Sequence, residues 1–211
     1  MKIKEPKLKK ELSTDINYAI ENSEFTDTYF EQVPLSEIRD ITFDGCIFKK
    51  IDFTKIDLKD ITITDCIFDN CDLSNKCFDK MFITRCEFIN TKMVGTSFIE
   101  GTLKDVKFSL VKADYINFSS SKLNNILFEE TNLSYSYFNE SEMKNVYFDN
   151  ANLTRSSAYK VIHNELDLSN SILDGIIIDA SFLKDITISP FQAADLISLF
   201  GVNIRGGYGD N

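Results

Sequence analysis

Apolar side chains recur at every fifth position along most of the chain. From Phe43, thirty successive positions five apart lead to Ile188, and all of them except His163 are apolar. The position two residues before each of these carries mostly small or β-branched side chains, such as Cys46 and Val106. A period of five fits neither the 3.6-residue repeat of an amphipathic helix nor the two-residue alternation of a strand.

The pattern predicts a chain that turns a corner every five residues and coils around a square section. Four such faces make one coil, so every fourth central side chain falls into the same column. Aromatic rings on two opposite faces and smaller apolar groups on the other two would fill a narrow core. The aromatic columns are Phe48, Phe68, Phe88, Phe108, Phe128 and Phe148 on one face, and Phe78, Phe98, Phe118 and Phe138 on the opposite face. We therefore expect an all-β solenoid over residues 18–190.

The start of the chain follows a different phase. Ile20, Phe25, Phe30 and Leu35 are also spaced by five, and they predict one additional coil. The interval between Leu35 and Phe43 is longer than five, which predicts a loop or bulge around residues 36–42. Residues 1–17 form a basic segment, with five Lys and two Glu among the first eleven residues.

The end of the chain predicts a helix. Ser189 and Pro190 are typical of an N-cap and a first helical residue, and Gly201 is typical of a helix end, which places the helix at about 190–200. Packing on the open end of the rod would bury one apolar side. A twofold dimer is the favoured way to cover the other, and a helix that merely caps a monomer is the alternative. Within residues 190–205 the expected dimer interface is Phe191, Ala194, Ile197, Phe200, Val202 and Ile204, and residues 206–211 are expected to form a flexible end.

Composition narrows the possible functions. The 211 residues carry 33 Asp and Glu against 23 Lys and Arg, and this excess argues against direct binding to nucleic acid or anionic membranes. No apolar run approaches the ~20 residues of a membrane span, and the N-terminus lacks the apolar region of a secretory signal. Five Cys without a disulfide spacing suit a reducing compartment, so we expect a cytoplasmic protein.

The inventory of reactive residues favours no enzyme. His163 is the only histidine, and its central position predicts either a local bulge that turns the ring outward or a hydrogen-bonded buried imidazole. The eight Gly form no phosphate-binding loop, so we expect no catalytic residue and no cofactor.

Two sets of stacked residues invite a metal. Cys46, Cys66 and Cys86 lie one coil apart, but side chains that all point inward suit neither zinc nor a disulfide. We favour the interpretation that these three cysteines and Cys71 are small apolar side chains that fill the core, and we expect Cys77 to be exposed. A cation between Asp52 and Asp72 is less favoured than hydrogen bonds from turn amides.

Charge is distributed unevenly over the four faces. The face with the Phe48 column has the largest acidic excess, about three charges, and is the candidate partner-binding surface. Its carboxylates are Asp69, Glu87, Glu129, Glu130, Asp149 and Asp167.

The repeat resembles the pentapeptide-repeat family, whose fold is a right-handed quadrilateral β-helix. The uninterrupted rod, the upstream coil in a shifted phase and the ending from Ile188 to Val202 resemble the Qnr and MfpA-like quinolone-resistance subgroup, in particular its loopless, Gram-positive-type members. The resemblance implies a bacterial homodimer with a helical dimerisation cap. It also implies a DNA mimic that binds DNA gyrase or topoisomerase IV and counters fluoroquinolones, with no substrate.

Size and charge support only part of that implied mimicry. A rod of ~40 Å, or ~80 Å as a dimer, suits a groove for duplex DNA. Residues 12–190 carry a net charge of −12, one per ~3.3 Å, whereas DNA carries one per ~1.7 Å. The absence of an insertion between Phe43 and Ile188 makes inhibition of gyrase a firmer expectation than protection from drug. The alternative function is a generic interaction scaffold with an unrelated protein partner.

Overall fold

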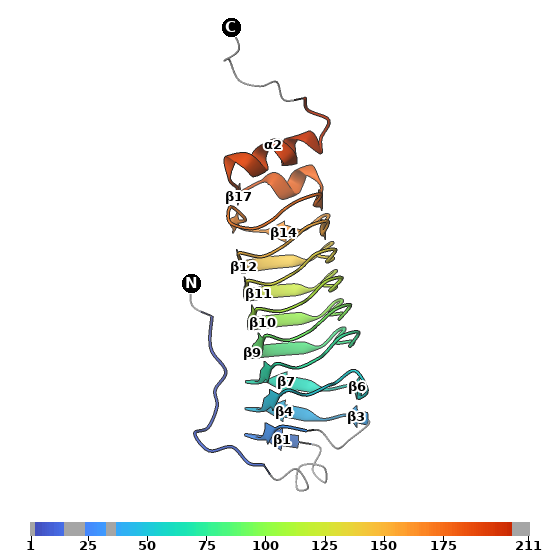
Figure 1. The fold of residues 1–211 in the computed structure, drawn as a ribbon, viewed down its shortest axis with the longest axis vertical. Coiled ribbons are helices and arrows are strands. Elements are labelled where there is room, and N and C mark those ends of the chain that lie inside the picture. Colours follow the sequence, from blue (N-terminus) through green and yellow to red (C-terminus); the bar gives the residue numbers. More distant parts are fainter. Residues whose placement is uncertain (1–2, 15–23, 33–36, 204–211) are drawn as a thin grey trace.

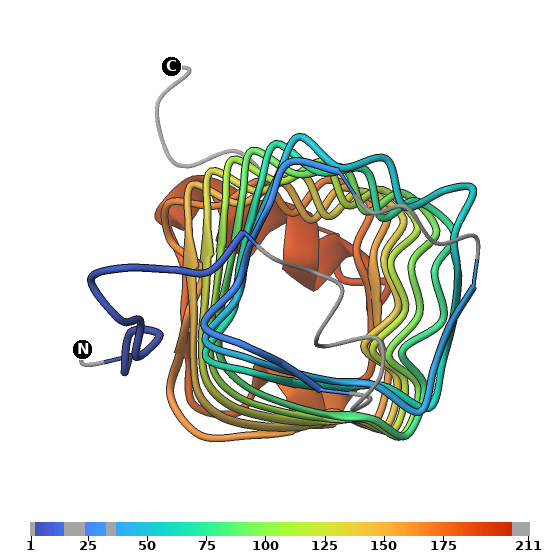
Figure 2. The ribbon, with the colours of Figure 1, turned by 90° about the horizontal axis from the view of Figure 1, so that it is seen from below.

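The chain forms a straight rod with a square cross-section (Figures 1 and 2). A computed structural model describes residues 3–14, 24–32 and 37–203. Parallel strands stack along the rod, and the longest path through the sheet runs β1-β4-β7-β9-β10-β11-β12-β14. Partners in neighbouring coils are separated by four pentapeptides, as for Phe108 and Phe128, so the predicted β-solenoid is confirmed.

Short strands flank four long ones in the middle of the rod. The first eight are β1 (Glu24–Thr26), β2 (Tyr29–Phe30), β3 (Glu37–Arg39), β4 (Thr42–Asp44), β5 (Ile47–Lys49), β6 (Asp57–Lys59), β7 (Thr62–Thr64) and β8 (Ile67–Asp69). The long strands are β9 (Phe82–Ile89), β10 (Thr102–Ser109), β11 (Lys122–Glu129) and β12 (Glu142–Asp149). The last coils contain β13 (Ser157–Ala158), β14 (Ile162–His163), β15 (Leu166–Asp167), β16 (Ile177–Ile178), the 3-10 helix η1 (Ala180–Leu183) and β17 (Ile186–Thr187).

The corners are made by residues in the left-handed backbone region, two positions after the central apolar residue. In the described part of the chain, twenty-five residues other than glycine have a positive φ, from Asp27 to Asp185. Ala113 shows how a corner closes, since its carbonyl accepts a 3.2 Å hydrogen bond from the N–H of Ile116 while Tyr115 has φ 59°. This is a type II turn, which requires a positive φ at its third residue. Asn and Asp are common at the corners because their side chains tolerate this conformation.

The predicted aromatic columns form the core. All ten phenylalanines are buried, and none is more than 6% exposed. Successive rings stack with centroids 4.7–5.1 Å apart in the column from Phe48 to Phe148 and 5.2–5.3 Å apart in the column from Phe78 to Phe138. Close packing of this kind leaves little free volume and makes each ring depend on its neighbours.

The first coil departs from the prediction in one place. Phe25 pairs with Phe43 and Phe30 with Phe48, which confirms an additional coil, but this coil is two positions shorter than the regular ones. Ile38 already pairs with Leu58 at the regular spacing and is buried in strand β3. The loop predicted around residues 36–42 is therefore wrong, because the phase changes between Phe30 and Glu37. Ile20 and Leu35 lie outside the described residues.

A capped helix closes the C-terminal end of the rod. Helix α2 (Pro190–Ser198) begins at the predicted N-cap, Ser189, whose hydroxyl accepts from the N–H of Gln192, while the Gln192 amide oxygen accepts from the N–H of Ser189 at 2.6 Å. This capping box, which the sequence prediction did not include, satisfies the first turn of the helix. Gly201 has φ +75° just beyond the helix. In the coil below, Phe182 is buried and Leu183, the predicted central residue, is only half-buried, because η1 changes the direction of the chain.

No helix among residues 3–14, 24–32 and 37–203 is long and apolar enough to cross a bilayer.

Candidate protein-interaction surfaces

The acidic face, defined as Asp69, Glu87, Glu129, Glu130, Asp149 and Asp167, follows the strands that carry the Phe48 column. Strand register places Asp69, Glu129 and Asp149 in one column, with Ile89 and Ser109 between them. Glu129 and Asp149 are neighbours on adjacent coils. Glu130 adjoins them at the corner, where its φ is 46°. The structure thus brings three predicted carboxylates together and leaves Asp69 three coils away.

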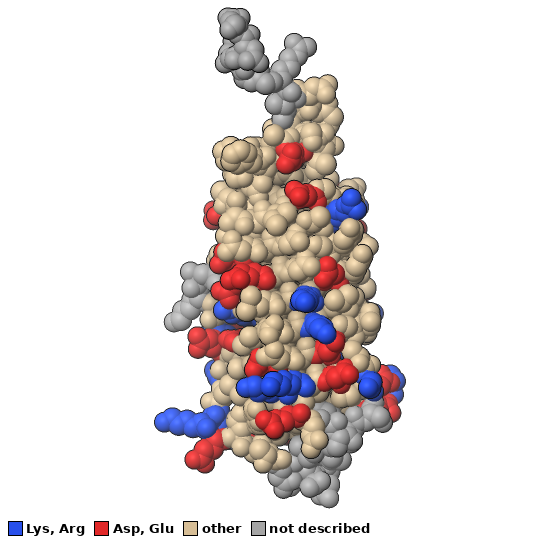
Figure 3. All heavy atoms as spheres, in the orientation of Figure 1, with Lys and Arg blue, Asp and Glu red and all other residues tan. Residues whose placement is uncertain are grey.

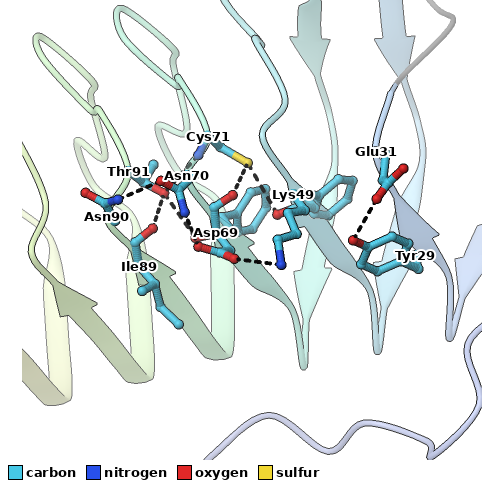
Figure 4. Close-up of polar contacts among 11 residues, drawn as sticks. Tyr29, Glu31, Lys49, Asp69, Asn70, Cys71, Ile89, Asn90 and Thr91 are labelled. Carbon is cyan, nitrogen blue, oxygen red and sulfur yellow. Dashed lines mark hydrogen bonds and ion pairs between the residues drawn. The ribbon is translucent and has the colours of Figure 1, made fainter.

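Asp69 is paired within the rod. Its carboxylate lies 3.6 Å from the Lys49 ammonium, one coil below, and accepts a 2.6 Å hydrogen bond from the Asn70 side chain (Figure 4). Asn70 in turn accepts from the Asn90 amide at 2.6 Å, so the corner carries a short ladder of amides. A carboxylate engaged in this way contributes little net negative charge to a partner.

Glu129 and Glu87 differ in their environments. Glu129 lies 2.9 Å from the Lys107 ammonium and accepts from the Ser109 hydroxyl at 2.9 Å; these contacts, that of Lys107 first, lower the pKa of Glu129. Burial raises the pKa of Glu87, because water stabilises its charged form less there. Glu129 is thus neutralised by Lys107, and Glu87 is half-buried instead of fully exposed.

Three carboxylates of the acidic face are exposed. Glu130 and Asp149 lie at the rod surface, where Asp149 accepts from the Asn170 amide at 2.7 Å. Asp167 accepts from the hydroxyl of Ser169 and then from its N–H, at 2.6 and 3.0 Å, which lowers the pKa of Asp167. These three residues are therefore the part of the acidic face that is accessible to a partner.

Positive and negative groups alternate on the surface of the rod. One face shows acidic and basic side chains interspersed over its lower part and few charges toward the C-terminal end (Figure 3). The acidic face also contains positive charges, because Lys49 and Lys107 pair with two of its six carboxylates. The surface potential is therefore patchy and weaker than that of a duplex.

A second acidic surface, which the sequence reasoning missed, lies on the neighbouring corner. We define this acidic corner as Asp27, Asp44, Asp65 and Asp105. Arg85 binds Asp65 through two hydrogen bonds of 2.6 Å, and Asn125 donates to Asp105 at 2.9 Å. Burial opposes ionisation of Asp65, but Arg85 and a backbone N–H outweigh it and lower the pKa of Asp65. Burial, then the charges of Asp65 and Asp27, raises the pKa of Asp44.

The N-terminal arm, residues 3–14, runs along the rod over this corner (Figure 1). The N–H of Lys7 donates to Asp65 at 2.9 Å, and the N–H of Lys4 donates to Asp105 at 3.4 Å. The Lys9 ammonium lies 2.6 Å from Asp27, and Ser13 forms a parallel bridge with Thr28 in the first coil. The available signals in the sequence were the excess of Lys at the start of the chain and the two Asp, 65 and 105, that recur two coils apart.

The C-terminal end presents an apolar surface. Leu196 faces the rod and is buried, whereas Phe191 is 89% exposed and Ile197, Phe200 and Val202 are 42–50% exposed. Ala194 is exposed on the same helix, and Ile204 lies outside the described residues. The five described residues of the predicted dimer interface are therefore at the surface of a single chain, and dimerisation remains a prediction.

The remaining candidate residues have structural environments. His163 is half-buried, its Nε2 lies 3.0 Å from the carbonyl oxygen of Phe182, and its ring packs edge-on against the Phe182 ring. This agrees with the hydrogen-bonded alternative, not with a ring turned outward. Asp52 and Asp72 accept from the N–H groups of Thr54 and Ser74, at 2.9 and 3.1 Å, as expected for turns.

The cysteines are free thiols. Cys46, Cys66, Cys71 and Cys86 are buried and Cys77 is exposed, as predicted. Burial raises the pKa of Cys71 to about 11, so that its thiol stays protonated and unreactive at neutral pH. Within the described part of the chain, no group of three or more His, Cys, Asp or Glu side chains could hold a metal ion.

A comparison with protein-family models also detects the five-residue repeat. Residues 61–138 match the family model described as pentapeptide repeat region. A comparison with curated proteins gave no match.

Several solved structures are similar to the chain at low sequence identity. Full-length QnrB1, a plasmid-mediated fluoroquinolone resistance protein, is 16% identical over 85% of this chain and 100% of its own, with a TM-score of 0.45. HetL of the cyanobacterium Nostoc, a pentapeptide repeat protein involved in heterocyst differentiation regulation, is 14% identical over 77% of this chain and 84% of its own, with a TM-score of 0.44. A pentapeptide repeat protein from the Arabidopsis thaliana thylakoid lumen is 21% identical over 43% of this chain and 60% of its own, with a TM-score of 0.27.

Proposed function

We propose that the protein binds a type II topoisomerase, DNA gyrase in the first place, at a surface that otherwise takes duplex DNA. Binding there inhibits the enzyme, reduces fluoroquinolone action, or does both. The observation that supports the proposal most directly is the uninterrupted square rod, in which strand register holds from Phe43 to His163. The sequence resemblance to the Qnr and MfpA-like subgroup supplies the class of partner.

The dimensions of the rod fit this partner. Eight coils at ~4.8 Å each give a rod of ~40 Å, and pairing two rods through their apolar C-terminal ends would give ~80 Å. The exposed helix residues Phe191 and Ile197 make such an end-to-end pair a reasonable arrangement.

Shape contributes more than charge in this proposal. Lys49 and Lys107 neutralise Asp69 and Glu129, so Glu130, Asp149 and Asp167 remain as the exposed anions of the acidic face. Three exposed charges favour encounter with a basic groove at low salt, and their effect weakens as salt screens them.

The patchy surface favours a second candidate, a scaffold that binds an unrelated protein. Charges of both signs are common at ordinary protein–protein interfaces, where they set specificity more than affinity. The same experiment separates the two candidates.

The decisive experiment is DNA supercoiling by purified gyrase, titrated with this protein in the absence and presence of ciprofloxacin. Supercoiling restored in the presence of drug would support a protector, and inhibition without drug would support a DNA-mimicking inhibitor. No effect in either arm would contradict topoisomerase binding and leave the scaffold.

A charge-reversal variant tests which surface makes the contact. We expect Glu129→Lys, Glu130→Lys and Asp149→Lys together to weaken gyrase binding at least tenfold, or ~1.4 kcal/mol, because the groove that accepts DNA is basic. The matched control reverses Glu100, Glu140 and Glu142, which lie at or beside the corner diagonally opposite Glu130 and change the net charge equally. Both variants should keep the circular dichroism spectrum of the native protein. Equal affinity of the two variants would exclude the acidic face from the contact.

A further inference from the structure

We infer that the N-terminal arm is a releasable strap, and that the acidic corner beneath it binds an extended basic segment of a partner protein once the arm has moved away. The inference goes beyond the proposed function and does not depend on a topoisomerase. It rests on how the arm is held, on what remains when it leaves, and on a mismatch of charge in the docked state.

The spacing of the arm matches the spacing of the corner. Lys4 and Lys7 are three residues apart, which is ~10 Å in an extended chain, and their N–H groups meet Asp105 and Asp65, two coils or ~9.6 Å apart. Both donors are main-chain groups. Another peptide with three residues per turn, as in a polyproline II chain, points the N–H groups of residues i and i+3 to the same side and offers the same donors whatever its side chains, and Lys or Arg side chains add charge complementarity.

The arm is held loosely. None of its residues is buried, and Lys9, which pairs with Asp27, is 71% exposed. Ile3, Pro6, Leu8 and Leu12 are half-buried, so the apolar contact with the rod is shallow. The core columns do not include any arm residue, and release of the arm leaves the core intact.

The two buried carboxylates of the corner keep partners when the arm leaves, while Asp27 loses its contact with Lys9. Asp65 retains both hydrogen bonds from Arg85, and Asp105 retains the bond from Asn125. Neither of these buried carboxylates is then left unpaired, which would otherwise oppose release strongly. Release of the arm therefore costs the corner the contacts from Lys4, Lys7 and Lys9 but leaves both buried carboxylates hydrogen-bonded.

The docked arm also contains a charge mismatch. Burial is the main cause of the raised pKa of Glu87, Lys107 opposes it, and the negative charge of Glu5 on the arm adds to it. A partner segment with Lys or Arg in place of Glu5 removes this repulsion and gains attraction to the corner carboxylates that Arg85 does not pair, namely Asp27, Asp44 and Asp105. Such a segment would compete with the arm for the same carboxylates.

The test uses the full chain and a defined peptide. The probe is a synthetic peptide with the sequence of residues 1–14 and Lys in place of Glu5, labelled at its C-terminus for fluorescence anisotropy. The open variant combines Lys4→Pro and Lys7→Pro, which removes the two N–H donors of the arm without touching the core. Lys10→Pro is the matched control, because the N–H of Lys10 meets no carboxylate in the described residues.

We expect the open variant to bind the probe at least tenfold more tightly than the native chain and the Lys10→Pro control. Adding Asp65→Asn and Asp105→Asn to the open variant should abolish that gain, and circular dichroism checks that the rod stays folded. Hydrogen exchange of the native chain should show the Lys4 and Lys7 amides exchanging faster than the amides of strand β10.

Three results would overturn the inference: equal affinity of the native and open chains, no binding to the open variant, or arm amides as protected as those of β10. Gyrase takes no part in these measurements, so their failure would leave the proposed function as it stands.

Discussion

Removal of one ring from the middle of the aromatic column is the most direct test of what holds the rod together. Phe108 is fully buried and stacks on Phe88 and Phe128 with centroid distances of 5.1 and 5.0 Å. A buried Phe→Ala change costs about 3–5 kcal/mol through lost transfer energy and the cavity that remains. Loss of two stacked pairs places Phe108→Ala at the upper end of that range, about 4–5 kcal/mol.

Phe148→Ala is the matched control for this prediction. Phe148 is also buried but stacks on one ring of its column, Phe128, at 5.1 Å. The two variants lose the same side chain and differ by one stacked pair, so we expect Phe108→Ala to lose about 1 kcal/mol more stability than Phe148→Ala.

Urea unfolding followed by circular dichroism at 25 °C measures both values, since the chain has no Trp to report by fluorescence. A loss for Phe108→Ala that is no larger than the loss for Phe148→Ala would refute a stabilising role of ring stacking. A further outcome is that the unfolding free energy depends less steeply on urea concentration in Phe108→Ala but not in Phe148→Ala. That result would mean that the two halves of the rod unfold separately, as in a one-dimensional repeat.

Two further predictions concern the end and the corners of the rod. We expect the native protein to be a dimer and the double variant Phe191→Asp, Ile197→Asp to be a monomer of 24.1 kDa, because both side chains are exposed on α2. Light scattering measures the mass, and a value for the variant still near twice 24.1 kDa would exclude the helix as the interface. We expect Leu110→Asn to raise the free energy of unfolding by about 1 kcal/mol, because Leu110 has φ 57° and Asn tolerates that conformation better. Ile172→Asn, equally exposed but without a positive φ, should give no gain, and equal effects would refute the argument from backbone strain.

The core could be predicted from the sequence because it repeats. Each central position, such as Phe88 or Phe128, meets the same environment one coil away, so thirty positions report on one local structure. The change of phase was placed too late because Ile38 was not recognised as a central residue. The five-residue spacing from Ile20 makes Leu35 the last central residue of the first coil, whereas in the structure Ile38 is already a central residue and pairs with Leu58.

The corners were harder to predict, since the sequence signal there is weak. Asn70 and Asn90 suit a positive φ, but Leu110, Tyr115 and Glu130 occupy the same kind of position. Tertiary packing overrides local preference at these residues, because the square section requires a corner wherever the period places one. Propensity alone would not have located them.

Counting charges along the sequence located the acidic face but not the ion pairs within it, and it missed the acidic corner. The acidic face loses part of its charge to Lys49 and Lys107, which stand on adjoining coils and could be matched to Asp69 and Glu129 only once the register was known. The docking of the arm depends on main-chain N–H groups that meet carboxylates 58 and 101 residues away. No pattern of side chains encodes a contact made by the backbone.

The architecture separates what the rod needs for stability from what it offers to partners. Inward positions are fixed by stacking, as Phe88, Phe108 and Phe128 show, whereas outward positions on the same strands change from coil to coil. Lys107, between Glu87 and Leu127 in register, can thus be positive where its neighbours are negative and apolar without disturbing the core. A rod of this kind can acquire a new partner by surface substitutions alone. Its function therefore has to be argued from the exposed carboxylates, the arm and the C-terminal helix, and not from the repeat that builds it.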